Sequence, residues 1–490
     1  MLLFGKRLCY RAALAGKRND LKRYTFILGA VALVALVAVG GVRYGKTHRR
    51  AAGPNVLLIT LDTLRRDRLG CYGSTVTRTP NIDRLANEGM VFDNAAAPMP
   101  ATRASHATIF TSQYPRDHGV MNNRMPLDPR VPMLSEVFQR AGYRTGGFVS
   151  VRLLGPESGM TRGFDVLDWP EHVRSADETI PLALEWLKTG RFEEPFFLWV
   201  HLYDPHMPYE PPAKFIPDGD PMHASKLGAV SWQRLAKLAR KTGGDLSQTT
   251  FEQVVSLYNG EVQYADHWLG ALLDALRTRT ALDHTIVAFT ADHGECFDHG
   301  IFFEHFNCLY EGAMHVPLIL RYPPKVAAGT RSNAVVEHLD IAPTLLTLAG
   351  LPVPETFRGT PYFSGRPAAD RNAFIQYPRF RIEHLHALAK RTDMRTVMGQ
   401  AVRPRLIVPP PVGIRNGDWK YIVSGSDEEL YHLPSDPGET RNLAAERPEV
   451  VSRLRPLLNR WIASHPEPPE NSTPISEAVK ETLRSLGYPE

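Results

Sequence analysis

The sequence predicts an α/β fold: a mainly parallel sheet sandwiched by helices, with a small C-terminal α+β subdomain. Three apolar segments predict buried strands of the sheet. Thr285–Thr290 is a β-branched and apolar run without Gly or Pro, Asn55–Asp62 is an apolar run that ends in an acid, and residues 196–209 begin with an apolar strand that ends in a polar cluster. Apolar residues at helical spacing predict helices at Pro80–Glu88 and over Val254–Leu276. Strands that alternate with helices are typical of a parallel sheet with helices on both faces.

The composition changes at about residue 366. Beyond it, Trp419–Val423 and Glu429–Leu433 predict short strands of a small antiparallel sheet, and Val450–Ile462 predicts a covering helix. Residues 213–250 show no clean periodicity, and we expect a charged insertion there. The expected organisation is a basic segment, an anchor, a stalk, a catalytic domain and a C-terminal subdomain with a tail, over residues 1–23, 24–42, 43–54, 55–365 and 366–490.

Charge and cysteine content exclude several classes of protein. The net charge is +5, but seven Lys or Arg residues precede residue 24, so the globular part is close to neutral. This balance argues against a nucleic-acid partner, which requires basic residues clustered on a folded face. The four cysteines show no CxxC spacing. Cys296 and Cys308 could pair in an oxidising compartment, which the sequence alone leaves open.

The N-terminal segment predicts a membrane anchor. Tyr24–Val42 is an uncharged run of 19 residues, and a helix of that length spans roughly 28 Å, close to a bilayer core. The preceding positive charge predicts a cytoplasmic N-terminus, hence a single-pass protein of the cell membrane with a periplasmic or extracellular catalytic domain. A cleaved signal peptide is the alternative, but no clear A-x-A site follows the run.

Two predicted strands end in residues that suit a divalent metal ion. The strand that begins at Asn55 runs into Asp62, and the strand over Thr285–Thr290 is followed by Asp292 and His293. Ligands of α/β sheets bind outside the carboxyl ends of the strands. A carboxylate beside a neutral imidazole suits a divalent cation, and crowded carboxylates are tolerated mainly where a cation neutralises them. Helix capping by Asp292 with a surface His293 is the alternative.

Thr102 lies where a loop changes into a helix. A threonine at that position commonly caps the helix. A helix N-terminus also stabilises an alkoxide and an anionic substrate, so a hydroxyl that contacts a metal there is a candidate nucleophile.

An ordered series of motifs resembles the sulfatase family of the alkaline-phosphatase superfamily. The matching segments include NVLLITLDTLRRDRLGCYG, TPNIDRLANEG, SHATIFTSQYPRDHGV, ADHGE, LYEGAMHVPLIL and HLDIAPTLLTLAGLP, and later NGDWKYI and ELYHLPSDPGETRNLA. The resemblance covers nearly the whole chain after residue 54. It implies an alkaline-phosphatase-like fold and ester hydrolysis with one divalent metal (Ca, Mn, Zn or Mg), held by Asp62, Thr102, Asp292 and His293.

The departures from the family pattern concern the nucleophile. Sulfatases carry a C/S-x-P-x-R motif whose Cys or Ser is oxidised to formylglycine. In this chain Thr102 takes the nucleophile position, Ala104 that of the proline and His106 that of the arginine. Threonine cannot become formylglycine by that route, so no formylglycine is expected. Asp62-Thr63 replaces the paired acids of the first strand, and Ser150 and Arg152 replace the family's Lys and His.

Further positions are assigned to substrate contact by their place in the family pattern. His206 resembles the residue that contacts the transferred group or protonates the leaving oxygen, a role that suits an imidazole. Substrate binding is expected of the remaining candidates: Asn123, Arg152, His201 and His315.

We therefore predict a metal-dependent hydrolase that cleaves sulfate or phosphate esters through Thr102, with His206 as its acid. A phosphodiester or phosphonate is favoured over a sulfate ester, because a sulfate on threonine lacks the formylglycine exit through a geminal diol. The expected partners are a sulfated or phosphorylated small molecule, glycan or lipid, and the membrane. The alternatives are a phosphoethanolamine-type transferase and a catalytically silent surface-binding protein on the same fold.

Overall fold

The computed structural model describes residues 53–190, 194–217, 227–279, 281–362, 371–379, 396–397, 400–401, 410–469 and 476–485. Eight strands of this part form the central sheet in the order β11-β2-β10-β7-β1-β5-β3-β4. The three innermost predicted strands are present as β1 (Asn55–Leu61), β5 (Phe196–Leu202) and β7 (Thr285–Ala291). The others are β2 (Met90–Ala96), β3 (Arg144–Val149), β4 (Val166–Asp168), β10 (Leu318–Arg321) and β11 (Thr330–Glu337).

The sheet is mainly parallel, as predicted. β1 lies between β5 and β7 and is parallel to both, with Thr60 opposite His201 on one side and Thr290 on the other. β10 runs antiparallel to both β7 and β2. The side chains of β5 and β7 are buried throughout, which is the expected pattern for strands covered on both faces.

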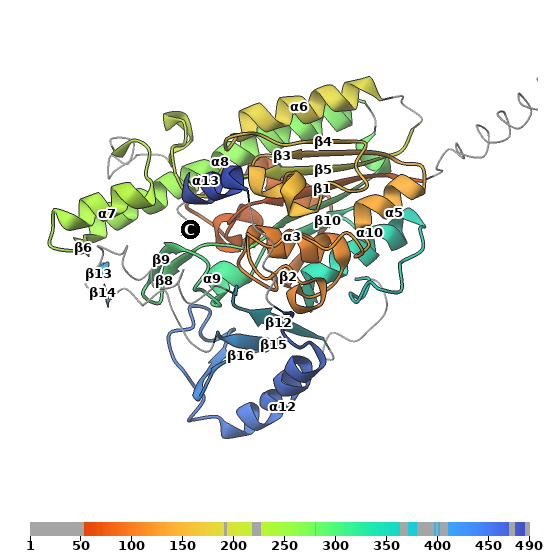
Figure 1. Ribbon diagram of the computed structural model, residues 1–490. Helices are drawn as coiled ribbons and strands as arrows, with labels where there is room; N and C mark the ends of the chain where they lie inside the picture. The colour runs from red at the N-terminus through yellow and green to blue at the C-terminus, as the bar shows by residue number, and fades with distance from the viewer. Residues whose placement is uncertain are drawn as a thin grey trace, which may run out of the picture. The chain divides into compact units, whose positions relative to one another are not determined.

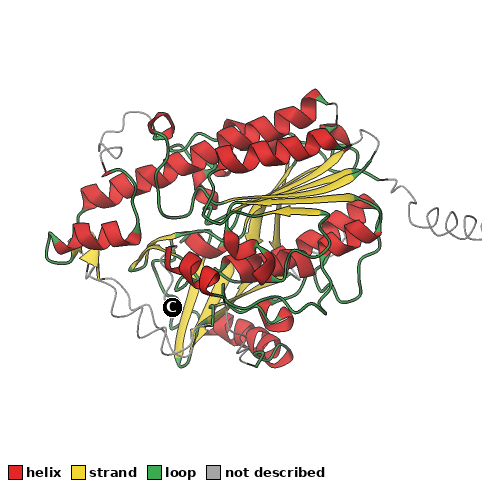
Figure 2. Ribbon diagram, turned by 45° about the horizontal axis from the view of Figure 1, so that its top comes forward, coloured by secondary structure: helices red, strands yellow, loops and turns green. Residues whose placement is uncertain are grey.

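Helices cover both faces of the sheet (Figures 1 and 2). One face carries α6 (Ala176–Thr189) and α8 (Gln248–Thr278), which also contact each other. The other face carries α3 (Thr102–Thr111), α5 (Leu134–Arg140) and α10 (Ile341–Ala349). Further helices are α2 (Pro80–Asn87), α4 (Pro115–His118), α7 (Trp232–Arg240), α9 (Glu311–Met314) and α13 (Glu477–Ser485).

A small C-terminal sheet packs against a helix, which confirms the predicted α+β subdomain. Its strands are β12 (Asn372–Gln376), β15 (Val412–Asn416), β16 (Trp419–Ser424) and β17 (Asp427–His432), all paired antiparallel. α12 (Pro448–Ser464) covers them and stacks Trp461 on Phe374 at a ring-centroid distance of 4.9 Å. A three-stranded sheet contains β6 (Asp245–Leu246), β13 (Thr396–Val397) and β14 (Gln400–Ala401).

The prediction of a membrane anchor requires correction. No helix in the described part of the chain is both long and apolar enough to cross a bilayer. α8 has the length, at 31 residues, but it carries charged side chains such as Glu261 and Asp266. The predicted segment, residues 24–42, lies outside the described residues. The structure therefore does not support a single-pass anchor, and the membrane and extracytoplasmic location that we inferred from it is withdrawn.

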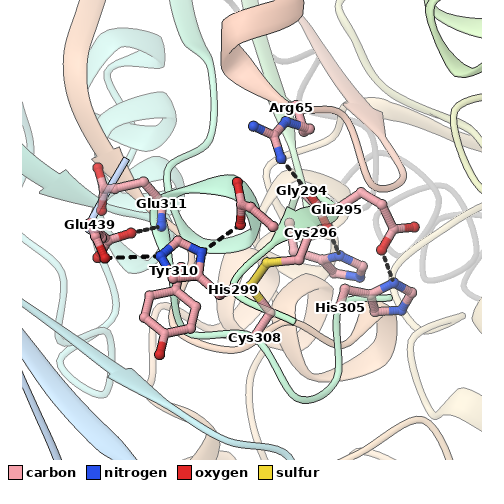
Figure 3. The surroundings of a disulfide bond; sticks show 12 residues. Arg65, Gly294, Glu295, Cys296, His299, His305, Cys308, Tyr310, Glu311 and Glu439 are labelled. Carbon is pink, nitrogen blue, oxygen red and sulfur yellow. Dashed lines mark hydrogen bonds and ion pairs between the residues drawn. A yellow bond between two sulfur atoms is a disulfide. The ribbon is translucent and has the colours of Figure 1, made fainter. Parts of the chain in front are cut away.

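A disulfide joins Cys296 to Cys308 beside the end of β7 (Figure 3). It closes a hairpin of β8 (Cys296–Asp298) and β9 (Ile301–Glu304). Next to it, His305 Nδ1 lies 3.2 Å from a carboxylate oxygen of Glu295, and the Glu295 backbone oxygen accepts a hydrogen bond from Arg65. The disulfide therefore fixes two chain segments that carry charged and imidazole side chains.

Removal of this disulfide should destabilise the protein. We expect the double variant Cys296→Ser/Cys308→Ser to lose about 3 kcal/mol of unfolding free energy, because a loop of this size is no longer closed in the unfolded chain. Urea denaturation of the oxidised protein measures the difference. Cys71→Ser, at the cysteine that is free among the described residues, is the matched control and should change the value by no more than about 0.5 kcal/mol. Equal stability of the double variant and the control would contradict a structural role for the bond.

Candidate active site

The carboxyl ends of adjacent parallel strands bring the predicted metal ligands together. Asp62 directly follows β1, and Asp292 and His293 directly follow β7. The backbone N–H of Asp62 donates to Leu202 and that of Asp292 to Leu61, so the pairing of the strands continues to the first site residues. Because the strands are parallel, these side chains leave the sheet at the same edge.

The three side chains form a cluster that fits a cation. His293 Nε2 lies 3.8 Å from an oxygen of Asp62 and 3.5 Å from an oxygen of Asp292. One ligand atom of each residue lies within 4.8 Å of those of the other two, and all three residues are fully buried. Asp62 Oδ1, Asp292 Oδ2 and His293 Nε2 have no hydrogen-bond partner among the described residues. Buried polar atoms without partners are costly, and a divalent ion would satisfy all three.

The electrostatics of the cluster also favour a bound cation. Burial raises the pKa of Asp62, and burial together with the charge of Asp62 raises the pKa of Asp292 well above its ordinary value. Burial lowers the pKa of His293 well below its ordinary value, which keeps the imidazole neutral and able to act as a ligand. A divalent cation stabilises the ionised form of both carboxylates.

Thr102 is the first residue of α3 and lies beside the cluster. Its hydroxyl donates a hydrogen bond of 3.3 Å to Asp62 Oδ2. Thr102 is fully buried, and the side-chain oxygen of Asn123 caps the same helix by accepting from the Arg103 N–H at 2.8 Å. Thr102, the predicted nucleophile, therefore contacts a carboxylate of the candidate metal site and lies at the positive end of a helix.

Two of the predicted histidines line the same site. His201 Nε2 lies 3.4 Å from Asp62 Oδ2. His206 Nδ1 lies 2.6 Å from the backbone oxygen of Met207 and 2.5 Å from the hydroxyl oxygen of Tyr203, whereas its buried Nε2 has no partner among the described residues. Burial lowers the pKa of His206 to about 4, and the charge of Asp62 acts in the opposite direction. An anionic substrate would act in the same direction as Asp62 and raise the pKa of His206.

Two other histidines complete the site and were not among the predicted site residues. The ring of His305 lies 4.5 Å from that of His293 and 5.3 Å from that of His206. His106 contacts the backbone oxygen of Thr102 through Nδ1 at 2.7 Å, and the same atom lies 3.7 Å from Asp292 Oδ2. The sequence signal for His106 was its position four residues after Thr102, one helical turn further along α3. No spacing signal identified His305.

Arg152 and His315 lie outside the metal cluster. Arg152 lines a cavity of about 670 Å³ that also includes His206, and it forms a 2.6 Å ion pair with Glu171. His315 lines a separate cavity of about 470 Å³, in which it forms a 2.7 Å ion pair with Glu311. None of the four metal-site residues lines this second cavity, so the structure does not bring His315 to the cluster.

Comparison with known proteins identifies the family of this chain. A family model described as Sulfatase matches residues 54–351, which is more than half of the chain. The chain belongs to the sulfatase family. The predicted resemblance is thereby confirmed, and this sulfatase-family protein is a hydrolase that acts on sulfate or phosphate esters. The enzymes of the family depend on a metal, and the buried cluster supplies candidate ligands for one.

Individual relatives cover nearly the whole chain. Arylsulfatase K from Bos taurus is 27% identical over 90% of this chain and 88% of its own length. A structure determined in complex with its substrate, D-glucosamine-2-N,6-O-disulfate, shares the fold with a TM-score of 0.68 and 23% identity, over 86% of this chain and all of that one. The phosphonate monoester hydrolase of Agrobacterium radiobacter has a TM-score of 0.64 at 23% identity, over 84% of this chain and 96% of that one.

The cluster predicts a measurable loss of metal in the Asp292→Asn variant. We expect its affinity for a divalent ion to fall by at least about 100-fold, since even outer-shell changes cost 10- to 100-fold. The affinity of the wild-type protein for the metal ion should also decrease as the pH is lowered. The pKa values of Asp62 and Asp292 are raised, so protons compete with the metal ion for these carboxylates more strongly than for ordinary ones. Elemental analysis and calorimetric titration with Ca²⁺, Mn²⁺, Zn²⁺ and Mg²⁺ measure both effects.

The matched control for this prediction is Asp128→Asn, a surface carboxylate that pairs with Arg130. It should retain the metal content of the wild-type protein. Stoichiometric metal in Asp292→Asn would contradict the assignment of this ligand.

Proposed function

We propose that this sulfatase-family hydrolase cleaves a phosphate or sulfate ester with Thr102 as its nucleophile, and that a phosphodiester or phosphonate is its preferred ester. The observation that carries the proposal is the 3.3 Å hydrogen bond from the Thr102 hydroxyl to Asp62 at the start of α3. This contact places the hydroxyl at the candidate metal cluster and at a helix N-terminus together.

Asp62, Asp292 and His293 would hold one divalent ion, with Thr102 as a fourth ligand. The ion would supply positive charge for the nucleophilic oxygen and for the negative charge of the transition state. The choice of Ca²⁺, Mn²⁺, Zn²⁺ or Mg²⁺ does not alter the roles of the surrounding residues. No formylglycine takes part, because residue 102 is a threonine.

The protein's own groups carry the two proton transfers. As the Thr102 oxygen forms a bond to phosphorus or sulfur, its proton passes to Asp62 Oδ2, which already accepts it in a hydrogen bond. The bond to the departing alcohol breaks on the opposite side. The bound anionic substrate raises the pKa of His206, so the ring is protonated at Nε2 and donates that proton to the departing oxygen. Water then attacks the phosphorus or sulfur and breaks the bond to Thr102. The proton held by Asp62 returns to the Thr102 oxygen, and His206 takes a proton from the attacking water. The product released is a phosphate monoester from a phosphodiester, a phosphonate from a phosphonate ester, or sulfate from a sulfate ester.

The preference for a phosphorus ester over a sulfate ester depends on how water releases the group bound to Thr102. A phosphoryl group on threonine can be released by in-line attack of water. In sulfatases with formylglycine, the sulfate is released when the geminal diol of that residue returns to the aldehyde, and threonine cannot form such a diol. The relatives include both chemistries, an arylsulfatase and a phosphonate monoester hydrolase. One structural neighbour has a sulfated glucosamine as its substrate, so a glycan ester belongs in the test panel with small-molecule and lipid esters.

Two other functions remain as alternatives. A phosphoethanolamine-type transferase would use the same first step and pass the group to an alcohol instead of water. The partnerless ligand atoms of Asp62, Asp292 and His293 argue against a catalytically silent binding protein, because a silent site has no need to retain costly buried charges.

The role of Thr102 predicts the effect of Thr102→Ala. Turnover of p-nitrophenyl sulfate, phosphate, phosphodiester and phosphonate should fall about 10³-fold or more for whichever ester the wild-type enzyme cleaves, because no nucleophile remains. Thr278→Ala, at the exposed end of α8, is the control and should retain full activity. Near-normal rates in Thr102→Ala would remove Thr102 as the nucleophile.

The role of His206 predicts a dependence on the leaving group. With an alkyl ester, His206→Gln should lower kcat/KM by about 10²- to 10⁴-fold, the usual contribution of general acid catalysis. With the p-nitrophenyl ester the loss should be much smaller, since p-nitrophenolate departs without protonation. Equal losses with both esters would indicate that His206 binds the substrate without protonating the alcohol.

A further inference from the structure

The cavity beside His206 has a strongly acidic lining. Its volume is about 670 Å³, which is sufficient for a small organic ligand. Six carboxylates line it, and two guanidinium groups oppose them: Glu171, Glu178, Asp204, Glu210, Glu261 and Glu481 against Arg152 and Arg174. Both arginines already have acidic partners, since Arg152 pairs with Glu171 at 2.6 Å and Arg174 with Asp168 at 2.5 Å.

Two of these carboxylates are buried and lie on different elements. Asp204 follows β5 and is 8% exposed, and Glu261 lies on α8 and is 6% exposed. Asp204 accepts a hydrogen bond from the Ala176 N–H through Oδ1, but its Oδ2 is buried without a partner among the described residues. Glu261 accepts from the Glu210 N–H through Oε1. Both carboxylates line the same cavity, and burial together with the charge of Asp204 raises the pKa of Glu261.

The surroundings of this pair suit a primary ammonium group. The aromatic rings of Tyr203 and Tyr264 line the same cavity, and such rings attract cations through their faces. An ammonium group donates up to three hydrogen bonds, so it can satisfy Asp204 Oδ2 and bond to Glu261 while neutralising their repulsion. An uncharged hydroxyl would satisfy one acceptor but leave the repulsion in place.

We propose that this cavity binds the alcohol part of the substrate and that Asp204 and Glu261 recognise a primary ammonium group on it. The inference rests on the proposed function, because it is His206, as the acid for the departing alcohol, that links the cavity to the reaction. The substrate class is then an ester of an amino alcohol. An amino sugar and an ethanolamine-type compound share this chemistry.

Pairs of product-like compounds, one with and one without an ammonium group, test whether the cavity recognises this charge. Glucosamine is compared with N-acetylglucosamine, and ethanolamine with ethylene glycol, as inhibitors of p-nitrophenyl ester turnover and as ligands in a thermal-shift assay. We expect at least one amine to bind about 10-fold or more tightly than its neutral analogue, as a charge-assisted hydrogen bond provides. The pair with the larger ratio distinguishes an amino sugar from an ethanolamine-type compound.

Substitutions test whether Asp204 and Glu261 cause the preference for amines. In Glu261→Gln and in Asp204→Asn the ratio of amine to neutral affinity should fall towards one, whereas Glu185→Gln should retain the wild-type ratio. Glu185 is the control because it pairs with Lys188 on the exposed side of α6. If the loss of the α6 cap unfolds Asp204→Asn, Glu261→Gln still gives the answer.

Equal binding of amines and neutral analogues to the wild-type protein would overturn the inference, as would an unchanged ratio in Glu261→Gln. These outcomes are separate from failure of the proposed function. The thermal-shift assay requires no turnover, and unimpaired activity of Thr102→Ala would refute the nucleophile without altering the amine preference.

Discussion

Two carboxylates, Asp62 and Asp292, are buried at the ends of adjacent strands, and their mutual repulsion is the constraint on which the rest of the site depends. The parallel pairing of β1 with β7 leaves them no other direction, and burial raises the pKa of both. Protonation or a cation can relieve this repulsion. The neutral His293, within 4 Å of both, favours the cation, because it adds a ligand and no charge.

The side chains that we propose as catalytic groups lie around these two carboxylates. Helix α3 begins at the strand ends, so Thr102 contacts Asp62 while His106, one turn later, contacts both the Thr102 backbone and Asp292. His206 reaches the site from the loop after β5, and the cavity beyond it holds the acidic pair Asp204 and Glu261. Three environments of different charge are therefore close together: the candidate cation site, the N-terminus of α3, and the acidic cavity that we propose for the remainder of the substrate.

Elements with strong local signals could be predicted from the sequence. β1, β5 and β7 are continuous apolar runs, and the acids that follow β1 and β7 mark the edge of the sheet where ligands bind. Helix α7 was not predicted, because its short apolar face lies within the charged segment 213–250, which shows no clean periodicity when taken as a whole. Trp232, Leu235 and Ala239 stand at helical spacing there, and Leu235 and Ala239 are buried. His305 could not be assigned to the site, because the disulfide-closed hairpin that brings it to His293 is a long-range arrangement. His315 occupies a family position, but its contacts with Glu311 and Arg66 belong to another cavity.

The position of a bound metal ion tests the central claim most directly. Anomalous diffraction from crystals soaked in Mn²⁺ would locate the ion independently of any assumed mechanism. One peak within about 2.0 to 2.6 Å of oxygen or nitrogen atoms of Asp62, Asp292, His293 and Thr102 is the predicted result. A fully occupied manganese peak elsewhere, with none among these four side chains, would contradict the account.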